Sequence, residues 1–396
     1  MKPKAKTEWT RRLWHAYEKS PPVMKDLVAT ARGAWERQRR YGPYFRAHRL
    51  ALEESQWWTP EEQARWLGER LRRFVHRAAT SVPFYRDLFA RAALSPDAVR
   101  EIEDLQQLPL LDAETVQREY EGLQPEGEDA EPAVLLRTPG PEKRAVTVPI
   151  SQECFEREWA LRWQQLSWRG IRPGHRCATL ADDALVVALG PEPPFWVTNY
   201  AESELLLSYR RLSERTLPAY AAKLRDWKPV LLHGPPSALA GLALGLRDLG
   251  DASVRPRVVV AEGETLTWEE RTAIEMQFQC KISYCYSNAE MVAHVAECDH
   301  GNLHVRPDHS WVEFLNERGE SARPGELAEM VGTGYGNISF PLIRCRTGDG
   351  AVLAERPCPC NRGGLTLRAV IVAAFRPAAV PSSTEGTAAA AVAEAA

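Results

Sequence analysis

Three cysteines and a histidine lie in two short segments whose residue types suit a metal ion. Cys298 and His304 lie in the first segment, and Cys358 and Cys360 follow about 55 residues later. Thiolates and imidazole are the usual ligands of tetrahedral zinc. No open coordination position is evident, so we expect a structural site, with His300 competing with His304 for the fourth position. Buried, reduced thiols are the alternative interpretation.

Two carboxylates stand where apolar strands are expected to end. Glu290 lies four residues after Tyr286, and Asp349 directly follows a glycine. An aromatic ring can cover the face of a purine, and a carboxylate can hold a hard cation such as Mg²⁺. The two acceptor oxygens of an aspartate suit the two hydroxyls of a ribose. A buried tyrosine, a solvated glutamate and a simple Gly-Asp turn are the ordinary alternatives.

Two glycine-containing connections complete the candidate set. Glu262 and Gly263 directly follow an apolar run, and ligands of open α/β sheets bind beyond the carboxyl ends of strands. A strand–helix connection that needs glycine for its backbone angles is the alternative. The loop at 135–144 offers backbone N–H groups and a cation to phosphates through Thr138, Gly140 and Lys143. Its two prolines and its glutamate favour an ordinary surface turn instead.

Short apolar runs and helical patterns alternate around these residues. We expect strands at Ala133–Leu136, Ala178–Leu180, Leu185–Ala188, Val230–His233, Arg257–Val260 and Ile282–Tyr286. We expect helices at Gln152–Trp168, Ser237–Leu249 and Trp268–Phe278. This alternation predicts an α/β domain with largely parallel strand pairing.

The chain divides into three regions by pattern. We expect residues 1–130 to be mostly helical and residues 131–370 to form the α/β core, with a β-rich part at about 302–353. Thr59 and Glu62 form a capping box that predicts a helix start, and Thr267 with Glu270 forms another. Residues 371–396 have almost no large apolar side chain, which predicts a disordered, Ala-rich tail.

Composition narrows the class of protein. The 50 basic and 53 acidic residues leave a net charge of −3, without the basic excess of a nucleic-acid or anionic-membrane binder. The longest apolar run, Ala238–Leu246, is far shorter than the roughly 20 residues that span a bilayer. No signal peptide is recognisable, so the eight cysteines do not indicate a disulfide framework. We expect a cytoplasmic protein without nucleic-acid or membrane partners.

In their order along the chain, these segments resemble the phenylacetate–CoA ligase-like branch of the adenylate-forming enzymes, which includes capsular-polysaccharide and coenzyme F390 synthetase-like proteins. The resemblance spans about residues 55 to 365. Its most specific stretch is Pro341–Asp349, which is similar to the family's PLIRYRTGD block with Cys345 in place of the tyrosine. The resemblance implies the layered α/β fold of the family's N-terminal domain. Some members of the family show a Cys/His set similar to the one above.

The resemblance also implies an activity. Such enzymes activate a carboxylic acid with ATP and Mg²⁺ to an acyl-adenylate and then transfer the acyl group to coenzyme A. An aromatic or other small acid is the expected substrate. By residue, the resemblance implies Thr138, Gly140 and Lys143 on the phosphate loop, Glu262 and Gly263 on the adenine-side turn, Tyr286 near the adenine, Glu290 on Mg²⁺ and Asp349 on the ribose. Lys143 and Glu290 would be the catalytic members of this set.

The sequence departs from the family pattern in ways that support a second hypothesis. Ala289 replaces a threonine directed at the α-phosphate, and prolines occupy the phosphate loop. No lysine follows Lys281, whereas the family continues into a small C-terminal domain with a functional lysine. A catalytically degenerate homologue that binds a nucleotide or acyl ligand, or serves as a partner protein, is therefore the alternative. A separate protein that supplies the C-terminal domain would reconcile the two hypotheses.

Overall fold

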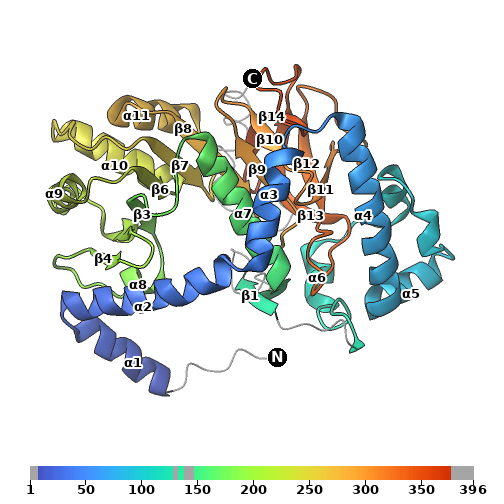
Figure 1. The fold of residues 1–396 in the computed structure, drawn as a ribbon, viewed down its shortest axis with the longest axis horizontal. Helices are drawn as coiled ribbons and strands as arrows, with labels where there is room; N and C mark the ends of the chain where they lie inside the picture. Colours follow the sequence, from blue (N-terminus) through green and yellow to red (C-terminus); the bar gives the residue numbers. More distant parts are fainter. Residues whose placement is uncertain (1–7, 128–132, 138–146, 376–396) are drawn as a thin grey trace. The chain divides into compact units, whose positions relative to one another are not determined.

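The described part of the chain forms two compact units, each built from two separate stretches of sequence. The computed structural model describes residues 8–127, 133–137 and 147–375 (Figure 1). The first unit comprises Met1–Arg39 and Arg169–Ser283, and the second comprises Arg40–Trp168 and Tyr284–Ala396. None of the helices in the described ranges is both long enough and apolar enough to cross a membrane.

The first unit contains a mostly parallel sheet. Its strands lie in the order β7-β6-β3-β5-β4, and only β4 runs antiparallel to its neighbour. The strands are β3 (Cys177–Ala181), β4 (Trp196–Asn199), β5 (Glu204–Ser208), β6 (Leu231–Gly234) and β7 (Val258–Glu262). The helices are α1 (Glu8–Lys19), α2 (Pro22–Arg40), α8 (Ala184–Val187), α9 (Leu217–Trp227), α10 (Pro236–Asp248) and α11 (Trp268–Phe278). Helix α10 packs against β6, β7 and α11.

Local sequence signals explain most boundaries in this unit. The predicted capping box at α11 is present, because Thr267 accepts from the Glu270 N–H at 3.2 Å and Glu270 accepts from the Thr267 N–H at 3.0 Å. The prediction of a strand at Leu185–Ala188 is wrong, since this segment forms the single turn of α8. The Asp183 carboxylate caps that turn by accepting from the Leu185 N–H at 2.9 Å.

The second unit is built on antiparallel strands and carries most of the N-terminal helices. Its strands follow the order β11-β12-β13-β14-β10-β9-β8. They are β8 (Ile282–Ser287, which begins in the first unit), β9 (His294–Glu297), β10 (Leu303–Val305), β11 (Trp311–Leu315), β12 (Leu327–Thr333), β13 (Cys345–Leu353) and β14 (Thr366–Ile371). Strands β1 (Ala133–Arg137) and β2 (Thr147–Ser151) form a separate pair.

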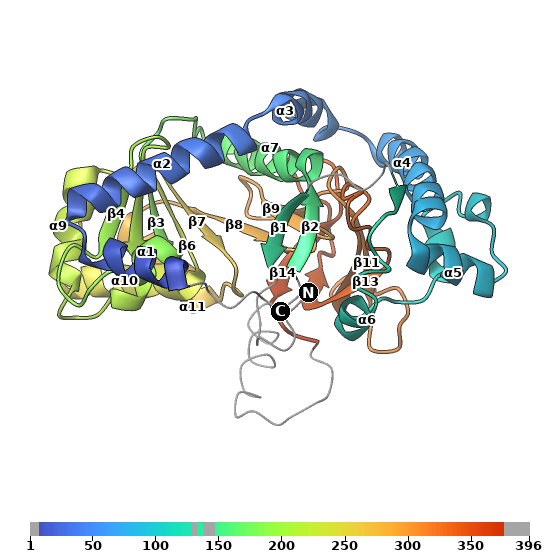
Figure 2. The same cartoon turned by 90° about the horizontal axis from the view of Figure 1, so that it is seen from below.

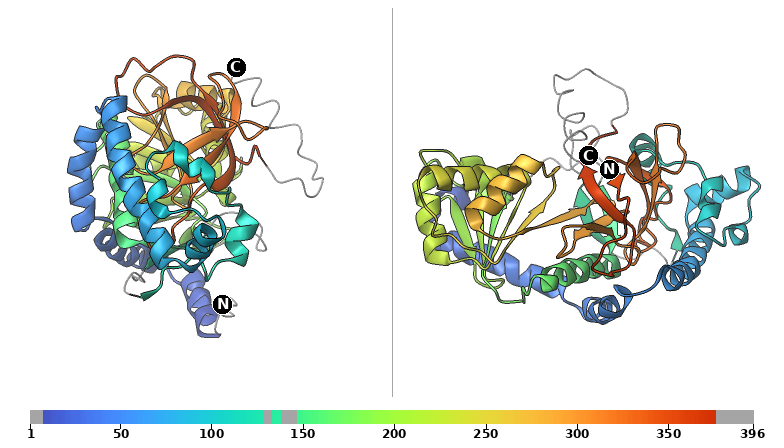
Figure 3. Two further views of the ribbon diagram at one scale, coloured as in Figure 1. Left: turned by 90° about the vertical axis from the view of Figure 1, so that its right-hand side faces the viewer. Right: turned by 90° about the horizontal axis from the view of Figure 1, so that it is seen from above.

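The helices of the second unit lie beside these strands (Figures 2 and 3). They are α3 (Pro43–Ser55), α4 (Pro60–Ser81), α5 (Pro83–Arg91), α6 (Ala113–Arg118) and α7 (Gln152–Trp168). Helix α4 starts at the predicted capping box of Thr59 and Glu62. The α/β class with a helical N-terminal region, predicted from the sequence, is confirmed.

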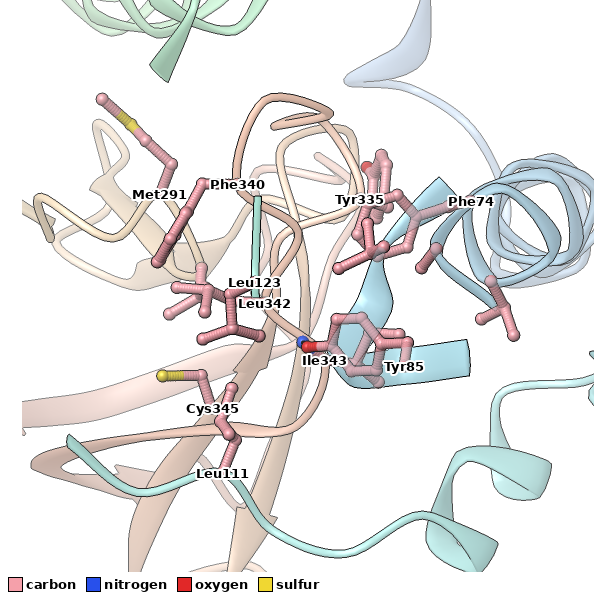
Figure 4. Packing of buried hydrophobic residues seen from close by; sticks show 14 of the residues in the cluster. Phe74, Tyr85, Leu111, Leu123, Met291, Tyr335, Phe340, Leu342, Ile343 and Cys345 are labelled. Atoms are coloured by element: carbon pink, nitrogen blue, oxygen red, sulfur yellow. The ribbon is translucent and has the colours of Figure 1, made fainter. Parts of the chain in front are cut away.

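The core of the second unit fixes the segment that leads into β13 (Figure 4). The Tyr85 hydroxyl, on α5, donates to the Pro341 carbonyl at 3.1 Å and accepts from the Ile343 N–H at 2.9 Å. Leu111 forms a parallel bridge with Cys345. The fully buried Tyr85 thereby ties a helix to the start of the strand that carries Asp349.

An ion pair reinforces the same segment. The Arg344 guanidinium contacts both carboxylate oxygens of Glu313 at 3.0 Å and donates to the Leu108 carbonyl at 2.6 Å. Both side chains of the pair are about nine-tenths buried. Bidentate pairs of this kind fix the relative orientation of two side chains more strictly than single contacts do. The pair therefore holds the residue directly before β13 in place.

Candidate functional site

Tyr286 and Asp349, two of the predicted ligand-binding residues, lie in contact in the second unit. Tyr286 is the penultimate residue of β8, near the strand end as predicted. The prediction that Asp349 also stands at a strand end is wrong, because it lies in the middle of β13. The Tyr286 hydroxyl donates to Asp349 Oδ2 at 2.6 Å. Burial first, and then the negative charge of Asp349, raise the pKa of Tyr286 well above its ordinary value. Tyr286 is therefore a neutral hydrogen-bond donor to the aspartate.

The second oxygen of Asp349 also has a partner in the chain. The Ala373 N–H donates to Asp349 Oδ1 at 2.6 Å. Residues 372–375, which we call the strap, follow β14, and their Phe375 N–H donates to the Gly348 carbonyl at 2.9 Å. Both carboxylate oxygens of Asp349 thus already accept a hydrogen bond from the chain, so a ligand at Oδ1 would compete with the strap.

Glu290 extends this pair into a cluster of acidic side chains. It lies in the tight connection between β8 and β9, where the Asn288 side chain accepts from the N–H groups of Val292 and Ala293 at 3.0 and 3.3 Å. Burial raises the pKa of Glu290, and the charge of Asp349 raises it further. Burial also raises the pKa of Asp349, although the hydrogen bonds from Tyr286 and Ala373 oppose that rise. A bound cation would relieve the cost of both negative charges.

Glu262 and Gly263 lie at the carboxyl end of β7 in the first unit. The Glu262 carboxylate lies 3.2 Å from Nε2 of His233, which comes from the neighbouring strand β6. Gly263 has a positive φ of 92°, a conformation that a side chain disfavours. The glycine is therefore required by the backbone, as the sequence alternative proposed, and the turn also stands where ligands of parallel sheets bind.

Three predicted residues, Thr138, Gly140 and Lys143, lie outside the described residues. Their assignment to a phosphate-binding loop stays a prediction.

The predicted Cys/His set gathers at one point of the second unit. The ligand atoms of Cys298, His304, Cys358 and Cys360 all lie within 4.8 Å of one another. Cys298 Sγ lies 3.5 Å from Cys358 Sγ, and Cys360 Sγ lies 3.3 Å from His304 Nε2. His300 is exposed and does not belong to the group, so His304 is the histidine of the set.

The surroundings of this cluster suit a metal-bound thiolate site. Cys358 Sγ accepts from the Asn302 side chain at 3.3 Å, and Cys360 Sγ accepts from the Arg362 N–H at 3.4 Å. Such N–H donors stabilise thiolate charge. His304 Nδ1 lies 3.3 Å from the Gly363 carbonyl, which orients Nε2 toward the thiols. Burial lowers the pKa of His304 to about 4, so its imidazole is neutral and able to coordinate. The cluster could hold zinc.

A buried charge cluster in the second unit was not predicted from the sequence. The carboxylate of Glu158, on α7, lies 3.2 Å from His294 Nδ1 and 3.2 Å from His309 Nε2. Both histidines are fully buried. Burial opposes ionisation of Glu158, but the two histidines hold its pKa well below the ordinary value. No spacing rule links residues 158, 294 and 309, so only the fold reveals this cluster.

Comparison with known sequences identifies distant relatives. Protein CapK of Staphylococcus aureus is 20% identical over 348 residues, which cover 88% of this chain and 74% of CapK. A phenylacetate–coenzyme A ligase of Thermus thermophilus is 25% identical over 320 residues, covering 76% of this chain and 68% of the ligase. One from Pseudomonas putida is 24% identical over 294 residues, covering 71% and 64%. No protein-family model matches the chain.

Comparison with solved structures shows the same fold class. The open conformation of 2-hydroxyisobutyryl-CoA ligase in complex with 2-HIB-AMP and CoA matches with a TM-score of 0.60 and 16% identity, over 80% of this chain and 75% of the ligase chain. The postadenylation state of that ligase with 2-HIB-AMP matches with a TM-score of 0.61 and 17% identity, over 80% and 68%. The predicted fold of the adenylate-forming N-terminal type is confirmed by these matches.

Proposed function

We propose that this chain, a distant homologue of CapK and of the phenylacetate–coenzyme A ligases, activates a small or aromatic carboxylic acid with ATP. The acid's carboxylate would attack the α-phosphorus of ATP, forming an acyl-adenylate as the bond to pyrophosphate breaks. The thiol of coenzyme A would then attack the acyl carbon, forming a thioester and releasing AMP. Both steps rely on positioning and on neutralising charge around the phosphates.

The observation that carries this proposal is the cluster of Tyr286, Glu290 and Asp349. Two segments of the chain, β8 with the turn that follows it and β13, bring a tyrosine and two carboxylates of raised pKa to one place. Asp349 would accept the ribose hydroxyls, with the Tyr286 hydroxyl holding its orientation. Glu290 would hold Mg²⁺, which neutralises charge on the phosphates when it is bound. Partly buried carboxylates without a cation are costly, so their presence together here supports a ligand-binding role.

The other predicted residues take their proposed roles from the same hypothesis. Glu262 and Gly263 would border the adenine, because they end a parallel strand where nucleotide ligands bind. Thr138, Gly140 and Lys143 would contact the phosphates through a hydroxyl, a backbone N–H and an ammonium group.

We also propose that Cys298, His304, Cys358 and Cys360 hold one structural zinc ion. Cys298 lies in the β9–β10 connection and His304 lies on β10, while Cys358 and Cys360 lie in the segment that precedes β14. Zinc would supply a covalent-strength link between these two parts of the chain. The four protein ligands would fill the tetrahedral shell, which supports a structural role rather than a catalytic one.

A nucleotide-binding or acyl-binding protein without adenylation activity is the second candidate. Two observations favour it. Ala289 lacks the hydroxyl that the resembled family directs at the α-phosphate, and the strap already donates a hydrogen bond to Asp349. This candidate retains ligand binding at Asp349 and Tyr286 but not the chemistry.

ATP–pyrophosphate exchange with Mg²⁺, measured against a panel of aryl and alkyl acids, separates the two candidates. We expect exchange with at least one acid and a loss of at least about 100-fold in Asp349→Ala. Glu317→Gln, an exposed carboxylate on a surface turn of the same unit, is the matched control and should keep full exchange. Folded protein that exchanges with no acid but still binds AMP would support the second candidate.

A further inference from the structure

Helix α2 of the first unit exposes a largely apolar face. Its exposed apolar side chains are Val23 (69%), Met24 (49%), Leu27 (56%), Val28 (42%) and Trp35 (56%). At 100° per residue, these positions fall within an arc of about 140° that runs over roughly four turns of the helix. Two exposed alanines, Ala31 and Ala34, lie in the same arc, where Gln38 is the sole polar residue. Helices of globular proteins ordinarily turn such an arc toward a core.

The opposite face of α2 is the one that holds the helix to its unit, beside α8 and β4 (Figure 1). Ala29 packs in a buried cluster with Val186 and Val197. The Asp26 carboxylate accepts from the Thr198 N–H at 2.7 Å. Gly33 lies so close to the Asn199 amide that a side chain there would overlap it. The exposed apolar arc is therefore not needed to fold this unit.

Arginines border the apolar arc and give this region a positive charge. Arg39 lies along one edge and Arg37 lies beyond the other. Arg32, next to Arg39 on the helix surface, is paired with Glu36 at 2.8 Å and with Asp183 at 2.7 Å, so its charge is compensated. Arg39 stacks on Trp35, with its guanidinium carbon 4.4 Å from the ring centroid. The first 40 residues contain eleven lysines and arginines against four acidic residues, although the whole chain carries −3. Helix α2 itself holds five of these basic residues against two acidic ones, so positive charge is concentrated on the helix that exposes its apolar side.

A second copy of this chain is the main competing occupant of the arc. In a two-fold contact the same patch meets itself, which would bring the arginine borders of the two copies together and cost energy by like-charge repulsion. A partner surface with an apolar interior and negative charges at its boundary would complement both the apolar arc and the arginines beside it. The headgroup region of an anionic lipid bilayer has this chemistry.

We propose that α2 is an interfacial helix that binds the chain to anionic membrane surfaces. The apolar arc would lie among the upper acyl carbons, with Trp35 at headgroup level and the arginines against lipid phosphates. The helix lies in the membrane plane and does not span it. This activity is independent of the proposed adenylation. The proposal departs from the expectation that the chain has no membrane partner. That expectation came from the net charge of the whole chain and did not consider how the charges are distributed along it.

Vesicle co-sedimentation of the full chain tests the proposal. Vesicles of phosphatidylcholine alone are compared with vesicles containing about 30% phosphatidylglycerol, at low salt and at about 0.5 M NaCl. Leu27→Asp places a charge in the middle of the arc, at a side chain that is 56% exposed. Met276→Asp, at a 74% exposed position on α11 of the same unit, is the matched control. Thermal unfolding of each variant verifies that it folds.

We expect the unmodified chain to bind the anionic vesicles at least about 10-fold more than the neutral ones, and high salt to weaken that binding. Leu27→Asp should reduce binding by about 10-fold or more, while Met276→Asp should bind like the unmodified chain. Equal binding to both vesicle types, no binding to either, or unchanged binding of folded Leu27→Asp would overturn the proposal. Light scattering that shows a dimer lost in Leu27→Asp, without vesicle binding, would assign the arc to a second copy instead.

Discussion

Glu290, the proposed Mg²⁺ ligand, should lower the stability of the folded chain at neutral pH. Its pKa lies above the ordinary value of 4.5 because of burial and the charge of Asp349. As pH rises through 4.5, the unfolded chain releases this proton before the folded chain does, which favours unfolding. The destabilisation is therefore absent below that pH and fully developed above the raised pKa.

Glu290→Gln should consequently stabilise the apo protein at neutral pH while weakening Mg²⁺-dependent nucleotide binding. We expect its melting temperature to rise by roughly 2 °C at pH 7 and to equal that of the unmodified chain near pH 4. Differential scanning calorimetry at both pH values measures the effect. Glu317→Gln, which changes an exposed carboxylate, should leave the melting temperature unchanged at both pH values. A lower melting temperature for Glu290→Gln at pH 7 would show that the charge is stabilising and contradict this account.

The residue types in the sequence identified the members of the acidic cluster as candidates, but they did not predict how these side chains contact one another. Tyr286, Glu290 and Asp349 could be selected from the sequence by their residue types and by their expected places near strand ends, although Asp349 lies in the middle of β13. The hydrogen bond from Tyr286 to Asp349 joins residues 63 positions apart, and no sequence period encodes such a contact. The Glu158, His294 and His309 cluster escaped prediction for the same reason.

At the scale of elements, the strap at residues 372–375 occupies the carboxylate that should bind ribose. Its Ala373 N–H bonds to Asp349, and the Phe375 ring lies against Gly350, where an added Cβ would be 3.2 Å from the ring. A ligand and the strap would therefore compete for the same oxygen.

Phe375→Ala removes the ring that holds the strap in place. We expect AMP to bind roughly 3-fold more tightly, because a larger fraction of the chain presents a free Asp349 oxygen. Isothermal titration calorimetry with AMP measures this, and Leu365→Ala, at a 48% exposed side chain just before β14, is the control. Weaker binding in Phe375→Ala would mean that the strap is part of the ligand site rather than its competitor.

The Cys/His cluster joins the β9–β10 connection and β10 to the segment before β14, so metal removal should loosen that segment. We expect about one zinc per chain by elemental analysis, and its loss in Cys360→Ser together with a melting temperature lower by several degrees. Cys280→Ser, a cysteine outside the cluster, should keep the zinc. Equal metal content in the unmodified chain and Cys360→Ser, including none in either, would favour the alternative of reduced thiols.

At the scale of the whole molecule, local signals predicted elements better than their assembly. Both capping boxes, at Thr59 and Thr267, start helices as expected, because each lies within four residues of sequence. The prediction of a strand at Leu185–Ala188 was wrong because a short apolar run fits a strand or a helical turn equally well. Each compact unit joins two distant stretches of the chain, a division that depends on long-range contacts.

Charge distribution gives a second example at this scale. The net charge of −3 indicates that basic and acidic residues nearly balance over the whole chain. The first 40 residues nevertheless hold eleven of the 50 basic residues and only four of the 53 acidic ones. This imbalance was present in the sequence. It becomes informative only with the structure, which shows that the basic segment also exposes the apolar side of α2.

The most direct test of the proposed site is a thermodynamic cycle on the ribose contact. Calorimetry would compare AMP with 2′,3′-dideoxy-AMP on the unmodified chain and on Asp349→Ala. Hydrogen bonds to a charged group are each worth roughly 1.5–3 kcal/mol, so the unmodified chain should bind AMP at least about 10-fold more tightly than the dideoxy analogue. Asp349→Ala should bind the two nucleotides equally. Equal binding of both by the unmodified chain, or the same preference in Asp349→Ala, would contradict the assignment of Asp349 to the ribose.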